Sequence, residues 1–411
     1  MNYQLRDYQQ EAADIAVHNL KNYGKPFVIQ AATGAGKSLI IADICHQLDA
    51  PVLILQPSIE ILNQNYAKLK SYGIEDISMY SASVNSKEIA KYTFATIGSI
   101  YKKPELFKHF KFVIIDECHG VDPKKLKGMY TSFLKAINCK NVCGLTATPY
   151  RIDQKYVTEN NAVYYTATIR MINRIPPFFF KKIAYKIETA ELIERGYLSP
   201  IDYYSEPVDL SGLKVNSTGA NFTDESIEQF WNDDKLRRIA QAVQYSNEHN
   251  ERTLVFCSSL RQANRACELS QALVGRCKVI DGKTPMKERT QSLEDFRNGH
   301  IKHLFNVGVF TTGFDMPNLD CIILARPTMS LALYYQMVGR GVRLDSAKPG
   351  KRLQIYDLVG IVERLGRVES IRIEVEKGGF RDEVWSEAGR IDDAPLFKFF
   401  VKNVQQKALA N

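Results

Sequence analysis

The sequence predicts an α/β protein with two tandem, doubly wound parallel-sheet domains and a short C-terminal appendage. Short apolar runs alternate with longer amphipathic stretches, a pattern typical of a parallel sheet covered by helices. The alternation occurs twice, and a stretch of different composition separates the two series. With 411 residues, the chain is long enough for each domain to bury its own core. We expect domains at residues 1–200 and 201–365, the second including a linker, and the appendage at residues 366–411.

The first series of apolar runs predicts buried strands, each followed by an amphipathic stretch of helical length. The expected strands are Phe27–Ile29, Val52–Leu55, Tyr92–Thr96, Phe112–Ile115 and Val142–Leu145. The expected helices are Arg6–Asn22, Lys37–His46, Ile59–Lys70 and Lys124–Lys135. These elements make up the first doubly wound domain.

The second series repeats this organisation. The expected strands are Thr253–Phe256, Cys277–Ile280, His303–Val307, Cys321–Leu324 and Leu353–Leu358, with Lys235–Tyr245 as the leading helix. Between the two series, Ser211–Gly219 is polar and contains glycine, so we expect a loop or linker there. Beyond Ile361 the regular pattern fades, which separates the appendage from the second domain.

The composition sets broad limits on function. The net charge of +8 suits a polyanionic partner, but it suits a solvated basic surface equally well. Most of the eight cysteines lie inside apolar runs, and none form paired C-x-x-C motifs, so we expect buried free thiols and no structural zinc. We see no secretory signal and no run near the ~18 apolar residues of a membrane span. We therefore expect a cytoplasmic protein without a membrane partner.

A glycine-rich turn follows the first expected strand and opens the next helix. It reads Ala31-Ala32-Thr33-Gly34-Ala35-Gly36-Lys37-Ser38. The backbone N–H groups of such a turn and the positive end of the helix dipole converge on a phosphate. Lys37 would reach the β- and γ-phosphates, and the Ser38 hydroxyl would hold Mg²⁺. The residues expected to bind the nucleotide here are Thr33, Gly34, Ala35, Gly36, Lys37 and Ser38. Ala31 stands where the G-x-x-x-x-G-K-[ST] pattern has its first glycine.

Two consecutive acids end the expected strand Phe112–Ile115. Open α/β sheets build their sites at the carboxyl ends of parallel strands. We expect Asp116 to hold Mg²⁺ through its water shell, and Glu117 to act as the general base on an attacking water. We expect His119 to link this site to the loop Thr146–Thr148.

Asp116-Glu117-Cys118-His119, coming after the glycine-rich turn, resembles the DECH variant of box II in superfamily 2 DExH/DECH-box helicases. Further stretches resemble helicase motifs in order and spacing: Leu5–Gln9 the Q motif, Leu55–Leu62 motif Ia, Phe94–Ile100 the later strand-end loop, Thr146–Pro149 motif III, Leu254–Ser259 motif IV, Val309–Pro317 motif V and Gln336–Arg343 motif VI. The resemblance covers residues 5–343 and implies two RecA-like domains.

The resemblance also implies which residues bind ATP and nucleic acid. In the Q motif, the side-chain amide of Gln9 offers a donor and an acceptor that match the adenine edge, which favours ATP over GTP, and Arg6 belongs to the same motif. In motif V, Gly313 and Asp315 would contact the nucleotide, with Asp315 on the ribose. The implied nucleic-acid contacts are Pro57, Ser58, Thr96, Ser258 and Thr312. Thr146 and Thr148 would couple the two sites together with His119.

The second expected domain has no phosphate loop of its own, so one ATP is expected in the cleft between the domains. In the stretch resembling motif VI, Arg340 and Arg343 are three residues apart and would share one face if that stretch is helical. We expect both to stabilise the charge on the transferring phosphoryl group as arginine fingers. Gln336 would place the attacking water or the γ-phosphate.

A finer resemblance points to RadD-like DNA repair helicases and their phage relatives. It rests on Thr146–Arg151, Leu192–Leu198 and the Thr311–Asp315 form of motif V. It implies a bacterial or phage-infected cell and movement from 3′ to 5′ on DNA. Those proteins often carry a C-terminal cysteine-rich module, whereas no cysteine follows Cys321 here. Val307 stands where RNA helicases commonly place a backbone-binding threonine, which favours DNA over RNA.

These patterns predict an ATP-dependent DNA helicase or translocase with ATP and Mg²⁺ as cofactors. We expect a monomer that binds single-stranded or forked DNA with weak sequence preference and strong salt dependence. Two alternatives stay open: a nucleic-acid-stimulated ATPase that remodels or anneals strands without processive unwinding, and the motor subunit of a restriction complex. Phe178–Lys182 either stacks on nucleobases or packs in a core, and its flanking prolines favour packing.

Overall fold

The computed structural model describes residues 3–122, 124–125, 127–159, 162–214, 216, 221–309, 316–375, 382–391 and 398–400. The chain divides into two compact units. The first consists of residues 1–151 and 170–192, and the second of residues 152–169 and 193–411. No helix within the described ranges is long and apolar enough to cross a membrane.

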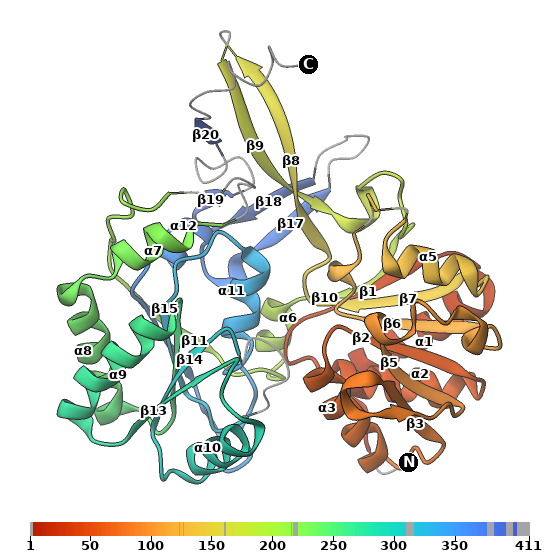
Figure 1. The fold of residues 1–411 in the computed structure, drawn as a ribbon, viewed down its shortest axis with the longest axis horizontal. Helices are drawn as coiled ribbons and strands as arrows, with labels where there is room; N and C mark the ends of the chain where they lie inside the picture. Colours follow the sequence, from red (N-terminus) through yellow and green to blue (C-terminus); the bar gives the residue numbers. More distant parts are fainter. Residues whose placement is uncertain are drawn as a thin grey trace. The chain divides into compact units, whose positions relative to one another are not determined.

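The first unit is built on an eight-stranded sheet with the order β10-β1-β7-β6-β2-β5-β3-β4 (Figure 1). Its strands are β1 (Phe27–Ala31), β2 (Val52–Gln56), β3 (Ile77–Ser81), β4 (Ser86–Lys87), β5 (Tyr92–Thr96), β6 (Phe112–Asp116), β7 (Asn141–Thr146) and β10 (Ile183–Ile187). All neighbours pair in parallel except β3 and β4, which are antiparallel. The helices are α1 (Asp7–Asn22), α2 (Lys37–Leu48), α3 (Ile59–Ser71), α4 (Ile97–Ile100) and α5 (Met129–Ala136), and α6 (Thr189–Glu194) runs across the division between the units at residue 192.

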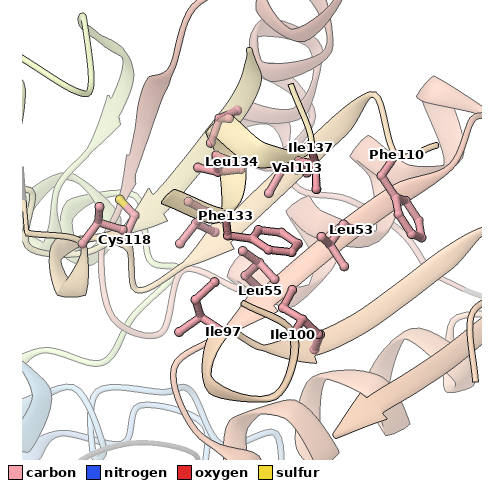
Figure 2. Packing of buried hydrophobic residues seen from close by; sticks show 14 of the residues in the cluster. Leu53, Leu55, Ile97, Ile100, Phe110, Val113, Cys118, Phe133, Leu134 and Ile137 are labelled. Carbon is pink, nitrogen blue, oxygen red and sulfur yellow. The ribbon is translucent and has the colours of Figure 1, made fainter. Parts of the chain in front are cut away.

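The central strands β1 and β2 of the first unit are largely apolar because both faces of a doubly wound sheet are covered. Every residue of β1 and of β2 is buried. On one side, Phe133 of α5 lies among Leu53, Leu55 and Val113 of the sheet (Figure 2). Cys118 belongs to the same cluster, so the residue between Glu117 and His119 is anchored in the hydrophobic core. This packing fixes the chain on either side of Cys118.

The second unit contains a six-stranded sheet, parallel throughout, with the order β11-β16-β15-β12-β14-β13. Its strands are β11 (Ile201–Ser205), β12 (Thr253–Cys257), β13 (Cys277–Asp281), β14 (His303–Val307), β15 (Cys321–Ala325) and β16 (Leu353–Asp357). Its helices are α7 (Asp224–Phe230), α8 (Asp233–His249), α9 (Leu260–Val274), α10 (Met286–Asn298), α11 (Leu331–Val338) and α12 (Ile361–Leu365). Helices α8 and α9 pack side by side (Figure 1).

Two smaller sheets complete the described part of the chain. One joins β17 (Arg372–Val375), β18 (Asp382–Ser386) and β19 (Gly389–Arg390). The other joins the long strands β8 (Tyr150–Glu159) and β9 (Ala162–Met171) with β20 (Lys398–Phe400), which pairs antiparallel to β9. The amphipathic and apolar-run patterns predicted neither sheet, because the sequences of these strands carry many polar residues.

The division into units differs from the expected boundary at residue 200. The backbone N–H of Ser199 donates to the carbonyl of Val342 at 2.7 Å, and β11 pairs with β16, so this stretch belongs to the second sheet. Residues 152–169 also group with the second unit. The stretch from residue 366 groups with the second unit as well, where the backbone N–H of Val368 donates to the Tyr203 hydroxyl at 3.1 Å.

Three local expectations need correction or refinement. The helix expected at Lys124–Lys135 begins only at Met129. The expected free thiols are present, and all are buried except the half-buried Cys139. In the aromatic run, Phe180 is fully buried in the core cluster while Phe178 is 47% exposed, so packing explains Phe180 but not Phe178.

Gly144 provides a direct test of the packing beneath the acidic strand end. A Cβ atom on Gly144 would lie 2.6 Å from the Cys118 sulfur and 2.9 Å from a Phe180 ring carbon. We predict that Gly144→Ala lowers the free energy of unfolding by about 1–3 kcal/mol, as overpacked cores do. Urea unfolding measures this, with Gly98→Ala as the control because a Cβ there would meet nothing within 4 Å. Equal unfolding midpoints for the two variants would contradict the packing described here.

Candidate nucleotide site

The glycine-rich turn lies between β1 and α2 in the first unit, as its sequence predicts. Gly34 and Gly36 have φ values of +87° and +80°, in the left-handed region that favours glycine. In the described part of the chain, no backbone carbonyl accepts from the N–H groups of Gly34, Gly36, Lys37 or Ser38. These donors sit at the N-terminus of α2, where the helix dipole is positive. The turn therefore has the form of an anion cradle.

Gln9 braces this turn from α1. Its side-chain amide donates to the carbonyl of Ala35 at 2.8 Å and accepts from the backbone N–H of Arg6 at 2.9 Å. Tyr8, its neighbour, donates its hydroxyl to the same Ala35 carbonyl at 3.0 Å. A Cβ atom on Gly36 would lie 2.5 Å from the Gln9 amide nitrogen, so a side chain there would displace the Gln9 amide. Gln9 is 3% exposed, and its hydrogen bonds with Ala35 and Arg6 hold the turn. Its contact with adenine stays a prediction.

Lys37 and the two acids meet at the carboxyl end of β6. The Lys37 Nζ lies 3.4 Å from Glu117 Oε1, and both side chains are largely buried. Asp116 is 4% exposed; its carboxylate accepts from the Asn65 side-chain amide at 3.0 Å and from the Glu117 backbone N–H at 2.9 Å. Glu117 has φ +47° and ψ +48°, a left-handed conformation that costs a non-glycine residue about 1–3 kcal/mol. This strained backbone turns the Glu117 side chain out of the strand direction, toward Lys37.

The environment shifts the pKa values of the two acids in opposite directions. Burial and the neighbouring Glu117 carboxylate raise the pKa of Asp116. Burial would also raise the pKa of Glu117, but Lys37 and His119 outweigh it and lower that pKa. Glu117 is therefore held ionised by its cationic neighbour, whereas Asp116 carries a carboxylate that a cation would stabilise.

His119 connects Glu117 to the end of β7. Its Nδ1 lies 3.4 Å from Glu117 Oε2, 2.9 Å from Thr146 Oγ1 and 3.3 Å from Thr148 Oγ1. The backbone N–H of Thr148 also donates to Thr146 Oγ1 at 3.0 Å. A continuous path of polar contacts thus runs from Lys37 through Glu117 and His119 to the Thr146–Thr148 loop.

Three polar contributors to this site were not singled out from the sequence. Asn65 donates to Asp116 and to Gln56 Oε1, the latter at 3.2 Å. Asn65 lies on the face of α3 that carries the buried Ile61 and Leu69. A polar residue at this four-residue spacing among apolar ones could have identified it from the sequence. Arg151 donates to the His119 carbonyl at 2.8 Å and holds that residue's backbone. Tyr8 is the third, through its contact with the turn.

The residues of the turn and strand end suit a bound Mg²⁺–nucleotide. The Ser38 hydroxyl and the Asp116 carboxylate are oxygen ligands of the kind Mg²⁺ prefers, and the cradle around Gly36 excludes a Cβ. No group of three or more His, Cys, Asp or Glu side chains among the described residues could hold a metal ion by itself. Mg²⁺ at phosphate sites is commonly held by one or two protein groups together with the phosphates, so this donor set fits.

The expected nucleic-acid contacts of the first unit lie at neighbouring strand ends. Pro57 is exposed directly after β2, and the half-buried Ser58 caps α3 by accepting from the Ile61 N–H at 3.4 Å. Thr96 ends β5, the strand paired with β2, and its hydroxyl lies 2.9 Å from Ser99 Oγ. Ser58 and Thr96 are therefore brought to the same sheet edge. Their contact with nucleic acid stays a prediction.

The second unit carries the remaining expected residues. Gln336 lies in α11, which ends at Val338, so Arg340 and Arg343 follow in turns beyond the helix. A shared helix face required this stretch to be helical, and α11 ends before both arginines, so that condition is not met. Arg340 Nε donates to the Gln336 carbonyl at 3.2 Å, and the Arg343 carbonyl accepts from Lys351 Nζ at 2.7 Å.

Ser258 follows β12, and its backbone N–H donates to Gln262 Oε1 at 2.7 Å. Its hydroxyl is buried without a hydrogen-bond partner among the described residues. Thr312, Gly313 and Asp315 lie outside the described residues, so their expected roles rest on the sequence alone.

Comparison with known proteins agrees with this geometry. Residues 2–151 match the family described as "Type III restriction enzyme, res subunit", and residues 234–345 match "Helicase conserved C-terminal domain". The Saccharomyces cerevisiae protein named "Putative ATP-dependent helicase IRC3" is 25% identical over 87% of this chain and 51% of its own length. A "51.5 kDa protein" of a Lactococcus phage is 25% identical over 78% of this chain and 63% of its own. The chain thus spans between about half and two thirds of these relatives.

A solved structure shows the same fold. The structure described as "ATP-dependent Type ISP restriction-modification enzyme LlaBIII bound to DNA" superposes with a TM-score of 0.62 at 18% identity. The match covers 87% of this chain and 28% of that one. The two sheets described above are therefore tandem RecA-like α/β domains. The two family matches relate residues 2–151 and 234–345 of this chain to superfamily 2 helicases.

Proposed function

We propose that this protein is an ATP-dependent DNA translocase or helicase. The observation that carries the proposal is the contact of Lys37 with Glu117 at 3.4 Å, beside a turn whose backbone N–H donors lie at the N-terminus of α2. A triphosphate in that turn would take the Lys37 ammonium as a partner, which releases the Glu117 carboxylate to orient a water. Mg²⁺, when bound by Ser38 and Asp116, would neutralise charge on the phosphates.

Arg340 and Arg343 of the second unit would contribute to the same triphosphate. A guanidinium donates several hydrogen bonds in a fixed plane and carries its charge at all relevant pH values, which suits the charge that develops on a transferring phosphoryl group. Gln336, one turn before Arg340, would position the water or the γ-phosphate. If both units contribute to one ATP, binding favours their closed arrangement and hydrolysis releases it.

His119 would transmit this cycle to nucleic acid. It contacts Glu117 on one side and the Thr146–Thr148 loop on the other, so a change at Glu117 reaches the end of β7 through hydrogen bonds. Ser58 and Thr96 would hold phosphates of the strand at the edge of the first sheet, and Ser258 at the second. Hydroxyl contacts to phosphates carry little sequence information, so we propose binding with weak sequence preference.

DNA is the proposed substrate, and RadD-like repair enzymes and phage proteins are the proposed subgroup. Two observations favour a second candidate, the motor of a restriction complex: the match of residues 2–151 to a restriction subunit family, and the fold shared with a restriction enzyme bound to DNA. Both candidates use the same ATP site. A strand remodeller without processive unwinding is the third possibility.

Replacing Lys37 tests the ATP site itself. We predict that Lys37→Ala lowers ATP turnover by about 100-fold or more, because the side chain that would hold the β- and γ-phosphates is removed. A colorimetric phosphate-release assay measures turnover, and circular dichroism checks that the fold persists. Lys21→Ala, on the exposed surface of α1, is the matched control. Turnover at the wild-type rate in Lys37→Ala would refute the assignment.

Four nucleic acids assayed in parallel separate the candidate functions. We predict that single-stranded and forked DNA stimulate ATP turnover more than duplex DNA or RNA of the same length. A strand-displacement assay on the forked substrate then distinguishes unwinding from ATP-driven remodelling. Turnover without displacement would favour remodelling, and stimulation by duplex DNA alone would favour a restriction-type motor. Equal stimulation by RNA would contradict the choice of DNA.

A further inference from the structure

A cavity lies wholly within the second unit and is lined by none of the residues proposed to bind ATP. Its volume is about 730 Å³, and its walls come from the ends of β11 and β16 and from one side of α8. Three tyrosines, Tyr204, Tyr245 and Tyr356, line it together with two cations, Lys235 and Arg238. We call it the tyrosine cavity. None of these residues has a role in the proposed ATP cycle.

The tyrosines form a connected aromatic surface. The Tyr204 and Tyr356 rings are stacked, with centroids 5.0 Å apart and an interplanar angle of 12°. Tyr245 meets Tyr356 edge-on at 5.8 Å. Tyr356 is buried beneath the other two, whereas Tyr204 is 46% exposed and Tyr245 is 48% exposed. Half-exposed rings on a buried aromatic base form a platform on which a flat ring can stack.

The cations stand on α8 beside this platform. Lys235, Arg238 and Tyr245 line the cavity from one side of the helix. The Lys235 Nζ lies 3.7 Å from the centroid of the Phe230 ring, which positions its charge. Within the described residues, Arg238 has no ion-pair partner, and Glu206 is the one exposed carboxylate in the lining. A ligand with a flat ring and a negative charge suits this arrangement.

The position of the tyrosine cavity in the sheet suggests where such a ligand comes from. Tyr204 and Tyr356 lie near the carboxyl ends of β11 and β16, and Ser258 follows the carboxyl end of β12. All these strands are parallel in the order β11-β16-β15-β12, so the cavity and Ser258 share one sheet edge. Three interstrand spacings separate β11 from β12, about 14 Å.

We infer that the tyrosine cavity binds a nucleobase and its phosphate from a single strand of nucleic acid that passes over Ser258. The base stacks on Tyr204 and Tyr245, and Lys235 and Arg238 neutralise the adjacent phosphate. Because every base has a π-face, this contact adds affinity with little sequence preference. The inference rests on the proposed function, since it needs a single strand at this sheet edge.

Binding to a fluorescein-labelled oligothymidylate tests the cavity, measured by anisotropy over a series of salt concentrations. We expect Tyr204→Ala to weaken binding about 5- to 100-fold and Tyr204→Phe to bind as the wild type does, because phenylalanine keeps the ring. Arg238→Ala should lower the slope of log affinity against log salt by about one. The control is Arg237→Ala, the neighbouring arginine, which pairs with Asp234 outside the cavity and should leave the slope unchanged.

Photocrosslinking with the same oligonucleotide carrying 5-iodouracil gives a readout that does not depend on stability. We expect crosslinks at Tyr204 or Tyr245, identified by mass spectrometry. If the wild-type chain binds the oligonucleotide and both Tyr204→Ala and Arg238→Ala bind it with the same affinity, the cavity assignment alone is overturned. Thymidine monophosphate binding as tightly as the oligonucleotide would overturn the choice of a strand. A wild-type chain that binds no oligothymidylate would overturn both this inference and the proposed function.

Discussion

The ion pair between Lys37 and Glu117 is the interaction on which the rest of the site depends. It joins the helix after the glycine-rich turn to the end of the central strand β6, and both partners are largely buried. Breaking a buried pair by removing one partner leaves an uncompensated charge, so each residue needs the other in the absence of a further charged group. A triphosphate supplies such a group. The pair is therefore suited to exchange partners when nucleotide binds, and His119 contacts both Glu117 and Thr146 at the end of β7.

The hydrophobic core fixes the position of the Glu117 carboxylate. Glu117 keeps a left-handed backbone because Cys118, the next residue, is anchored in the hydrophobic cluster beneath Gly144. Because Cys118 is rigidly packed and Glu117 has a constrained backbone, the fold sets the position of the Glu117 carboxylate. Asn65 completes the arrangement by holding Asp116. These polar groups converge on the turn from four elements, α2, α3, β6 and β7.

Much of this could be predicted from sequence, for physical reasons. Continuous apolar runs such as Phe112–Ile115 have few alternatives to a buried strand, and the turn at Gly34–Ser38 has a pattern with a defined mechanism. Asn65 and Arg151 were missed because their roles depend on tertiary contacts with Asp116 and His119. A shared helix face for Arg340 and Arg343 does not apply, because α11 ends at Val338, before both residues. The strands β8 and β9 were not predicted because their sequences carry many polar residues. The tyrosine cavity had no periodic pattern because its lining residues are distant in sequence.

The central claim is that residues from both units act on one triphosphate, and Arg343→Ala tests it most directly. Measure ATP affinity by titration of a fluorescent analogue and hydrolysis under single-turnover conditions, with Arg276→Ala, an exposed arginine of the same unit, as the control. The account predicts that Arg343→Ala binds ATP about as tightly as the wild type, while hydrolysis falls about 1,000-fold or more, as for other arginine fingers. Hydrolysis at the wild-type rate would show that the first unit acts alone and would contradict the account.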